Sequence, residues 1–270
     1  MKSKYSVFAA AFCLLLAGCK YGEVAHVWPS LGIERIQFCE REIATFRALV
    51  EKPVVSGAYA RQQKAIDEWI AEVASFGNCS NSTVEAVLET MSAKLAENVA
   101  TEKRETEGES WQMEALSYWY FDLDAQVAYA DDEYLAYQVC LDEFEGWLHP
   151  LRNYNWRVWS FGRGRELSAE DIFKKESIPD VIALVKEDMA YRHDCTNFVQ
   201  YAETCLIEDF EELPKNFTFD DRGIKFLFNA YEIACYAEGD IRGFVGWERL
   251  APYVKPDLIL PGSRAQKVSN

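Results

Sequence analysis

The order of apolar and polar positions divides the chain into a helical first third and a strand-rich remainder. Residues 61–76, RQQKAIDEWIAEVASF, place their apolar side chains on one helical face. Ser82 and Glu85 have the spacing of a capping box, which predicts the start of a second helix with an apolar stripe over residues 84–95. We therefore expect two amphipathic helices in this part of the chain.

Beyond these helices the pattern changes to short strands joined by turns. Residues 111–144 are dense in aromatic and β-favouring side chains, and residues 155–161 alternate between two faces. Residues 167–173, LSAEDIF, predict a capped helical turn, and Pro179 predicts a helix that continues to about residue 192. Residues 217–228 predict two strands around a tight turn. The fold class expected is α+β, with the helical N-terminal part packed on a mainly antiparallel, twisted sheet and a C-terminal hairpin region.

The N-terminus has the features of a bacterial lipoprotein signal. Lys2 and Lys4 precede an apolar run that ends in Leu-Ala-Gly-Cys, with Cys19 as the residue that would be acylated. We therefore expect a signal peptide over residues 1–18 and a membrane lipid anchor on Cys19. Lys20, in place of an aspartate, favours the outer membrane of a Gram-negative cell envelope, facing the periplasm or the exterior. The alternative is an ordinary secretory signal in which the cysteine is incidental.

The charge of the chain limits its partners. With 44 acidic and 28 basic residues, the net charge is −16. Such a surface repels nucleic acid and attracts cationic proteins, at association rates that fall as salt rises. The alternative is that acidity only keeps an exported protein soluble.

Cysteine usage fits an oxidising compartment. Once Cys13 has left with the signal and Cys19 is acylated, six candidates for disulfide bonds remain: Cys39, Cys79, Cys140, Cys195, Cys205 and Cys235. Six cysteines permit fifteen pairings, so the sequence leaves the connectivity open. Cys195 with Cys205 is a possible local pair only if the chain breaks between them, since one unbroken helix would hold them about 15 Å apart. None of the spacings is typical of a zinc site, and we expect no metal and no cofactor.

The stretch FTFDDRG, residues 217–223, resembles the opening motif of polysaccharide deacetylases, but the chemistry does not fit. That metal site needs two histidines one helical turn apart, whereas the 3 histidines of this chain are His26, His149 and His193. Asp221 and Gly223 instead favour a turn between two strands. We expect no catalytic residues, and His149 with Cys140 or Ser160 is the only conjectural alternative.

A series of motifs in the second half resembles a known family. The motifs are Gly146-Trp147-Leu148-His149, Gly164, Leu167-Ser168, Asp171-Ile172-Phe173, Asn216-Phe217, Asp221-Arg222-Gly223, Ile224-Lys225-Phe226-Leu227-Phe228, Tyr231-Glu232-Ile233 and Tyr236-Ala237-Glu238-Gly239. In this order they resemble the extracellular domain of the anti-sigma factor RsiV and the envelope proteins built on that module. Glu145, Trp147 and Leu148 make the turn before the histidine bulkier than in the family.

The resemblance implies a domain organisation. After the signal peptide it places a tether and N-terminal segment over residues 19–49, the module over 50–255 in two halves (50–140 and 141–255), and a tail over 256–270. The motif residues implied to be structural are Gly146, Asp221, Gly223, Tyr231 and Gly239.

The resemblance also implies a function. RsiV-like domains are receptors for lysozyme, so we expect a non-enzymatic, lipid-anchored envelope protein that binds or inhibits a cationic muramidase. The candidate partner-binding residues are Trp147, His149, Tyr154, Trp156 and Trp159. A peptidoglycan-associated envelope module is the alternative, and a hydrolase with an unrecognised site is a more remote one.

Overall fold

A computed structural model gives the fold. It describes residues 20–21, 25–28, 31–41, 43–77, 82–105, 110–146 and 148–261. The predicted signal peptide and the acylated Cys19 lie outside the described residues, as do Cys79 and Trp147.

The chain forms two compact units. Unit 1 contains Val139–Arg152 and the described residues up to Gln126, and unit 2 contains Val127–Gln138 and the described residues from Asn153 onward. Three strands contribute residues to both units: β5 (Tyr120–Ala130), β6 (Tyr134–Phe144) and β7 (Leu151–Ser160).

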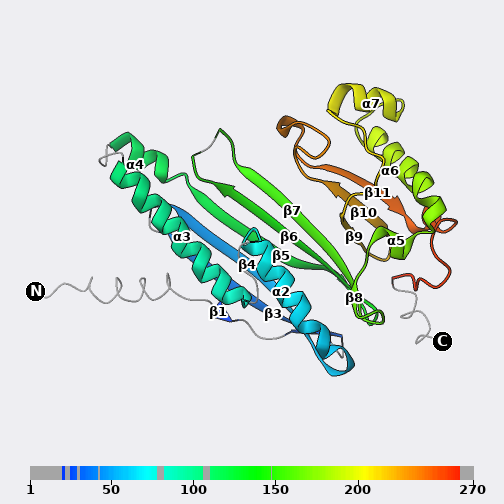
Figure 1. The fold of residues 1–270 in the computed structure, drawn as a ribbon, viewed down its shortest axis with the longest axis horizontal. Coiled ribbons are helices and arrows are strands. Elements are labelled where there is room, and N and C mark those ends of the chain that lie inside the picture. Colours follow the sequence, from blue (N-terminus) through cyan, green and yellow to red (C-terminus); the bar gives the residue numbers. More distant parts are fainter. Residues whose placement is uncertain are drawn as a thin grey trace, which may run out of the picture. The chain divides into compact units, whose positions relative to one another are not determined.

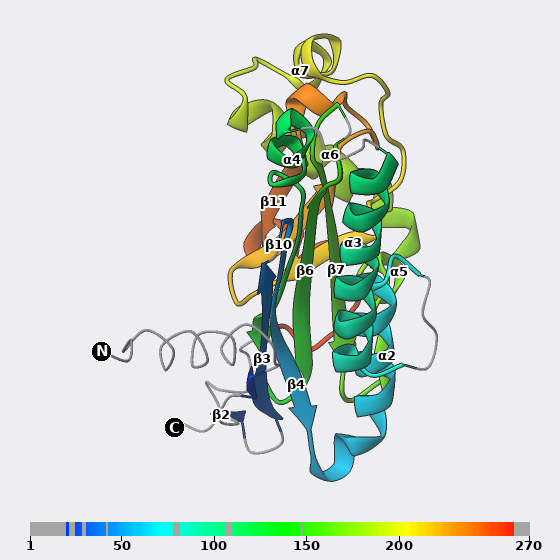
Figure 2. The same cartoon turned by 90° about the vertical axis from the view of Figure 1, so that its left-hand side faces the viewer.

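Unit 1 combines long strands with helices. Its other strands are β1 (Lys20–Tyr21), β2 (Ala25–Trp28), β3 (Leu31–Arg41) and β4 (Thr45–Val55). Its helices are η1 (Gly57–Gln62), α2 (Gln63–Ala74), α3 (Val84–Glu105) and α4 (Ser110–Leu116). Figures 1 and 2 show α2 and α3 side by side on one face of β3 and β4.

The large sheet has the strand order β1-β3-β4-β5-β6-β7-β8, with β2 beside β3. The pairs β1–β3, β2–β3, β3–β4 and β7–β8 are antiparallel, whereas β4 and β5 run parallel from Thr45 opposite Tyr120 to Val50 opposite Ala125. Parallel neighbours need a long crossover, and α2, α3 and α4 supply it. The sheet is therefore mixed, with one parallel pair among described pairs that are otherwise antiparallel, which agrees with the mainly antiparallel sheet expected.

Strand β4 shows why this part of the chain is extended. Its side chains alternate, with Phe46, Ala48 and Val50 buried and Arg47 and Leu49 exposed. That period of two is the pattern of a sheet with one covered face. The buried face meets α2, whose Ile66 and Ile70 are completely buried.

Unit 2 is built around a smaller antiparallel sheet with the order β11-β10-β9. This sheet consists of β9 (Asn216–Phe219), β10 (Gly223–Phe228) and β11 (Ile241–Gly246). The unit also contains β8 (Arg165–Glu166), which pairs with β7 in the large sheet. Its helices are α5 (Ala169–Ile172), η2 (Lys175–Ser177), α6 (Ile178–Arg192), α7 (Phe198–Cys205), η3 (Tyr236–Glu238) and α8 (Trp247–Leu250). Helix α6 packs along β11 and buries Val185 and Met189 against the sheet (Figure 1).

The FTFDDRG stretch is the β9–β10 hairpin, as the sequence predicts. The backbone N–H of Asp220 donates to the carbonyl of Gly223 at 3.1 Å, which closes the turn. The Asp220 carboxylate accepts from the backbone N–H of Arg222 at 2.9 Å, so Asp220, rather than Asp221, folds the turn through its side chain. A Cβ on Gly223 would lie 2.3 Å from the carbonyl oxygen of Val245, which explains why glycine is required there.

The α+β class is confirmed, and several local predictions match closely. Ser168 and Asp171 form a capping box at α5, and Pro179 lies in the first turn of α6. The predicted cap of α3 is shifted by one residue, because Thr83, not Ser82, accepts the backbone N–H of Ala86 at 3.2 Å. Among the described residues, no helix combines the length and the apolar character needed to cross a membrane.

Candidate functional site

Unit 1 contains an open pocket of about 590 Å³ between α3 and the ends of the neighbouring strands. Its lining is Phe76, Met91, Lys94, Leu95, Asn98, Phe121, Glu143, Glu145, His149 and Leu151. Five of these residues are apolar and five carry a charged or hydrogen-bonding group. A mainly apolar hollow with a few polar groups at one side is the usual form of a ligand site.

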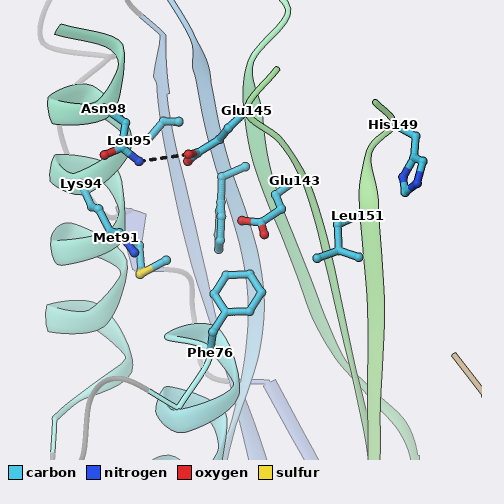
Figure 3. A pocket seen from close by; sticks show the side chains of 10 residues that line it. Phe76, Met91, Lys94, Leu95, Asn98, Glu143, Glu145, His149 and Leu151 are labelled. Atoms are coloured by element: carbon cyan, nitrogen blue, oxygen red, sulfur yellow. Dashed lines mark hydrogen bonds between the residues drawn. The ribbon is translucent and has the colours of Figure 1, made fainter. Parts of the chain in front are cut away.

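Helix α3 provides one wall through a single stripe of side chains. Met91, Lys94, Leu95 and Asn98 are separated by three, four and seven positions, so they share one face of the helix. Figure 3 shows all four pointing from α3 towards the strands. These four side chains extend the buried face of α3, and this face becomes more polar towards the C-terminal half of the helix.

The end of β6 provides the carboxylates. Val139 and Leu141 are buried on the inner face of β6, and Glu143 and Glu145 continue the same alternation at the next two positions of that face. The pattern that supplies apolar side chains to the core therefore turns acidic where β6 ends. This break in the alternation is the signal by which the two glutamates could have been found in the sequence, where they were missed.

The two glutamates have different surroundings. Glu145 accepts a hydrogen bond of 3.0 Å from the side-chain amide of Asn98, drawn as a dashed line in Figure 3. Burial raises the pKa of Glu143, and the charge of Glu145 raises it further, whereas Lys94 only partly offsets them. The pocket thus holds a carboxylate whose charged form lacks sufficient compensation.

Of the predicted partner-binding residues that the structure describes, His149 lines this pocket. Its Nδ1 atom lies 3.1 Å from the carbonyl oxygen of the adjacent Pro150. The described lining adds two carboxylates near this imidazole but contributes no hydroxyl or thiol that could serve as a nucleophile. The described part of the lining is therefore suited to holding a cation.

Three other predicted partner-binding residues, Tyr154, Trp156 and Trp159, belong to unit 2. Tyr154 and Trp156 pack edge to face, with ring centroids 6.2 Å apart. Trp156 and Trp159 are each 4% exposed, so neither presents its whole ring to solvent. Their role in binding a partner stays a prediction.

The predicted structural motif residues occupy turns and close approaches. Gly146 has a φ of 83°, a conformation that favours glycine, and a Cβ there would lie 2.9 Å from Nε1 of Trp119. Tyr231 adopts a positive φ of 71° in the loop after β10, and its backbone N–H donates to the carbonyl of Ala234 at 2.9 Å. Gly239 follows η3, and Asp221 lies on the outside of the β9–β10 turn.

Three of the predicted disulfide cysteines gather in unit 2. Cys195 lies between the end of α6 at Arg192 and the start of α7 at Phe198, whereas Cys205 is the last residue of α7, so the two cysteines are not on one unbroken helix. Burial raises the pKa of the Cys205 thiol, and Glu238, Cys195 and Cys235 raise it further. Cys39, Cys195, Cys205 and Cys235 are present as free thiols and Cys140 is half-buried, and the pairing of the cysteines stays a prediction.

The part of the chain that the structure describes contains no group of three or more histidine, cysteine or acidic side chains placed to hold a metal ion. At the deacetylase-like stretch, Asp220 instead pairs with Arg222 at 2.7 Å and with Lys225 at 3.4 Å. Its carboxylate is therefore occupied by cations of the same hairpin.

Comparisons with known proteins support the fold and a family relationship for part of the chain. Residues 170–248 match the family model described as a protein of unknown function (DUF3298). A DUF3298-family structure from Bacteroides fragilis is similar at a TM-score of 0.66 and 13% identity, over 90% of this chain and 96% of that one. Another from Pseudomonas aeruginosa is similar at a TM-score of 0.56 and 12% identity, over 89% of this chain and 98% of that one.

At these identities the two structures establish a shared fold and nothing about activity. The comparison with curated proteins finds no match. The family resemblance expected from the motifs is supported at the level of DUF3298, while the RsiV-like specificity stays a prediction.

Proposed function

We propose that the protein is a non-enzymatic, lipid-anchored binding protein of the cell envelope that captures a cationic protein, a lysozyme-like muramidase. The observation that carries the proposal is the pocket of unit 1, in which Glu143 and Glu145 face an apolar floor. The anchor would be Cys19, in accordance with the signal pattern at the N-terminus.

The pocket suits a lysine or arginine side chain of a partner. Such a side chain has an apolar stem and a charged head. The stem would lie against Met91, Leu95 and Leu151, while the head would approach Glu143 beside Glu145. A partner cation would compensate the carboxylate whose pKa is raised by burial, and this gain favours a cation over a neutral group.

The charge of the whole chain supports the same class of partner. A net charge of −16 attracts a strongly basic protein over distances longer than any single contact. This attraction increases the association rate, whereas the carboxylates of the pocket would determine how long the complex lasts. Long-range and local electrostatics can therefore be separated by experiment.

The test is a calorimetric titration of the full chain, carrying Cys19→Ser to prevent acylation, with hen-type lysozyme at low and high salt. We expect saturable binding at low salt that weakens as salt rises. Glu143→Gln should weaken it by about tenfold or more, because it removes the charge that faces the bound cation.

Glu89→Gln is the matched control, since Glu89 is an exposed carboxylate of α3 that does not line the pocket. Glu89→Gln changes the net charge by the same amount as Glu143→Gln, and we expect it to change the affinity for lysozyme by less than about twofold. The absence of saturable binding at low salt would remove lysozyme as the ligand. Equal weakening by both variants would leave net charge as the only determinant and would reject the pocket.

Two other functions give distinct outcomes in the same set of experiments. A peptidoglycan-associated module would bind purified cell walls in a manner insensitive to salt and competed by muropeptides. A hydrolase is the remote case, and its specific support is the presence of two carboxylates in one pocket, the groups that glycoside hydrolysis uses. Clearing of a cell-wall suspension that Glu143→Gln abolishes would establish the hydrolase and contradict the binding proposal.

A further inference from the structure

Unit 2 contains a second hollow whose charge is opposite to that of the chain. It has a volume of about 280 Å³ and is lined by Trp156, Arg192, Arg222, Lys225, Arg242, Gly243 and Phe244. Four of the 28 basic residues of a strongly acidic protein thus line one small hollow, and its lining contains no carboxylate. The hollow is separate from the pocket of unit 1 and takes no part in the function proposed above.

The β10–β11 pairing brings these side chains together. Lys225 is opposite Phe244 and Leu227 is opposite Arg242, so Lys225, Phe244 and Arg242 share one face of the small sheet. The other face carries buried residues such as Phe226, which pack in the core with α6. Arg222 comes from the β9–β10 turn.

Arg192 completes the basic group from the last turn of α6. Asp188, one turn earlier, binds the Arg192 guanidinium at 2.6 Å and also accepts the backbone N–H of Phe244 at 2.7 Å. This carboxylate therefore fixes Arg192 beside the open edge of β11 and satisfies a strand donor that has no partner strand.

The aspartates that pair with the four cations lie outside the lining and hold them in place. Asp220 binds both Arg222 and Lys225, and Asp240 binds Arg242. Together, Asp188, Asp220 and Asp240 form ion pairs with all four cations of the hollow. The cationic side chains remain between 40% and 70% exposed, so their other N–H donors face the hollow or solvent.

Aromatic rings give the hollow an apolar side. The guanidinium carbon of Arg242 lies 5.0 Å from the ring centroid of Tyr154 and 5.7 Å from that of Trp156. These cation–π contacts restrict the orientations of the Arg242 side chain. Phe244 adds a second aromatic surface to the lining.

A buried polar group lies on the same face of the sheet. Thr218 is opposite Lys225 across the β9–β10 pair and is 1% exposed. Its hydroxyl has no hydrogen-bond partner among the described residues. A buried hydroxyl costs free energy when it is left unsatisfied, so this face offers a hydrogen-bonding group that the described residues do not use.

We propose that this hollow binds a small organic carboxylate whose apolar or aromatic part rests on Trp156 and Phe244. A guanidinium fork matches a carboxylate in geometry, and Arg242 and Arg222 provide two such forks with Lys225 between them. The volume is near the lower end of the range for ligand pockets, which suits an acylated amino acid or the C-terminal residue of a peptide.

The test uses N-benzoylglycine as the probe and N-benzoylglycinamide, its neutral counterpart, as the control ligand. Both are titrated into the full chain at low salt and followed by calorimetry and by NMR chemical shifts. We expect N-benzoylglycine to bind saturably, at least about tenfold more tightly than the amide and than acetate, because it combines charge with a ring.

Variants locate the site. Arg242→Gln and Arg222→Gln should each weaken binding of N-benzoylglycine about five- to tenfold. Arg249→Gln is the matched control, because Arg249 has a similar exposure of 47% and pairs with Glu187 outside the hollow, and we expect less than a twofold effect. Arg222 is the more exposed of the two test residues, so its variant keeps the test valid should Arg242→Gln fail to fold.

Three results of these titrations would overturn the proposal, and a phosphate comparison adds a fourth. The three are no saturable binding of N-benzoylglycine at millimolar concentration, equal affinity for the amide, and weakening by Arg249→Gln as large as that by Arg242→Gln and Arg222→Gln. Inorganic phosphate provides the last comparison. Competition by phosphate at the same affinity as N-benzoylglycine would show that the hollow attracts any anion, and the proposed recognition of an organic carboxylate would then be wrong.

Discussion

The two hollows differ in how the protein treats its own charges. In unit 1, Glu143 lies among apolar side chains beside a second carboxylate, and its pKa is raised by burial and by the neighbouring charge. In unit 2, every cation of the basic hollow already contacts an aspartate. The pocket of unit 1 therefore holds a carboxylate whose charge its neighbours balance only in part. The hollow of unit 2 holds cationic side chains that neighbouring aspartates already orient.

The difference shows in the carboxylate of the β9–β10 turn. Burial opposes the ionisation of Asp220, but hydrogen bonds from Arg222 and the charge of Lys225 outweigh it and lower its pKa to about 2. Arg222 and Lys225 thus stabilise the charged form of Asp220, whereas Lys94 only partly stabilises the charged form of Glu143. A ligand of unit 1 would supply compensation, while a ligand of unit 2 would compete with existing pairs for N–H donors.

The largest effect that we predict concerns the hairpin that carries the basic hollow. Gly223→Ala would place a Cβ 2.3 Å from the carbonyl oxygen of Val245 and 2.8 Å from Cα of Gly246, both of them backbone atoms that cannot yield easily. We expect the free energy of unfolding measured in urea to fall by about 2–3 kcal/mol, and binding of N-benzoylglycine to weaken.

Gly246→Ala is the matched control, because Gly246 is the direct partner of Gly223 in the β10–β11 pair. Its nearest neighbour would be 3.6 Å away, an ordinary contact, so the change should remain within about 0.5 kcal/mol. Equal stability of the two variants would show that the close approach at Gly223 does not constrain the hairpin.

A smaller effect should appear in acid. Because the folded-state pKa of Asp220 is depressed to about 2 from an ordinary 3.8, its contribution to stability is present above pH 3.8 and is lost as the pH falls through about 2. Asp220→Asn should lower stability at neutral pH by about 1 kcal/mol after solvent screening, and the difference from wild type should disappear near pH 2.

Unfolding curves at a series of pH values provide the measurement. Asp221→Asn removes the same charge from the exposed outside of the turn and serves as the control. The prediction fails if the acid dependence of wild type and of Asp220→Asn is the same between pH 4 and 2.

The smallest predicted effect concerns Glu143, whose contribution to stability changes with pH in the direction opposite to that of Asp220. The folded-state pKa of Glu143 is raised above its ordinary 4.5, so its favourable contribution is present below pH 4.5 and is lost as the pH rises through the folded-state value. Glu143→Gln should therefore stabilise the protein at pH 7 by a few tenths of a kcal/mol, while it weakens lysozyme binding. Thermal unfolding measured beside Glu89→Gln tests this, and a loss of stability in Glu143→Gln alone would contradict the account.

The hairpin and the helices could be predicted because local chemistry determines them. Ser168, Asp171 and Pro179 act within one turn of chain, and the structure has them in the predicted places. Strands β3 and β4 were not predicted, although the buried Phe46, Ala48 and Val50 alternate with the exposed Arg47 and Leu49. Because Leu49 is apolar, it obscures that period in the sequence, and the location of the strands before the helices made the segment look like a tether.

The rest depends on contacts between distant segments. The parallel alignment of β4 with β5 follows from a crossover of three helices, which no local pattern specifies. The four cations of the basic hollow lie on α6, on a turn and on two strands, and only the folded register of β10 and β11 brings them together. Glu143 and Glu145 were within reach of sequence reasoning, since they interrupt the buried face of β6.

The most direct test of the central claim is the number of protons released when hen-type lysozyme binds, measured by calorimetry in buffers of different ionisation enthalpy above pH 4.5. A partner cation beside Glu143 must lower its raised pKa, so the wild-type chain should release protons on binding and its affinity should rise with pH, and Glu143→Gln should abolish that release. Binding with the same proton release in wild type and in Glu143→Gln would show that the cation is bound elsewhere, and the pocket of unit 1 would not be the site.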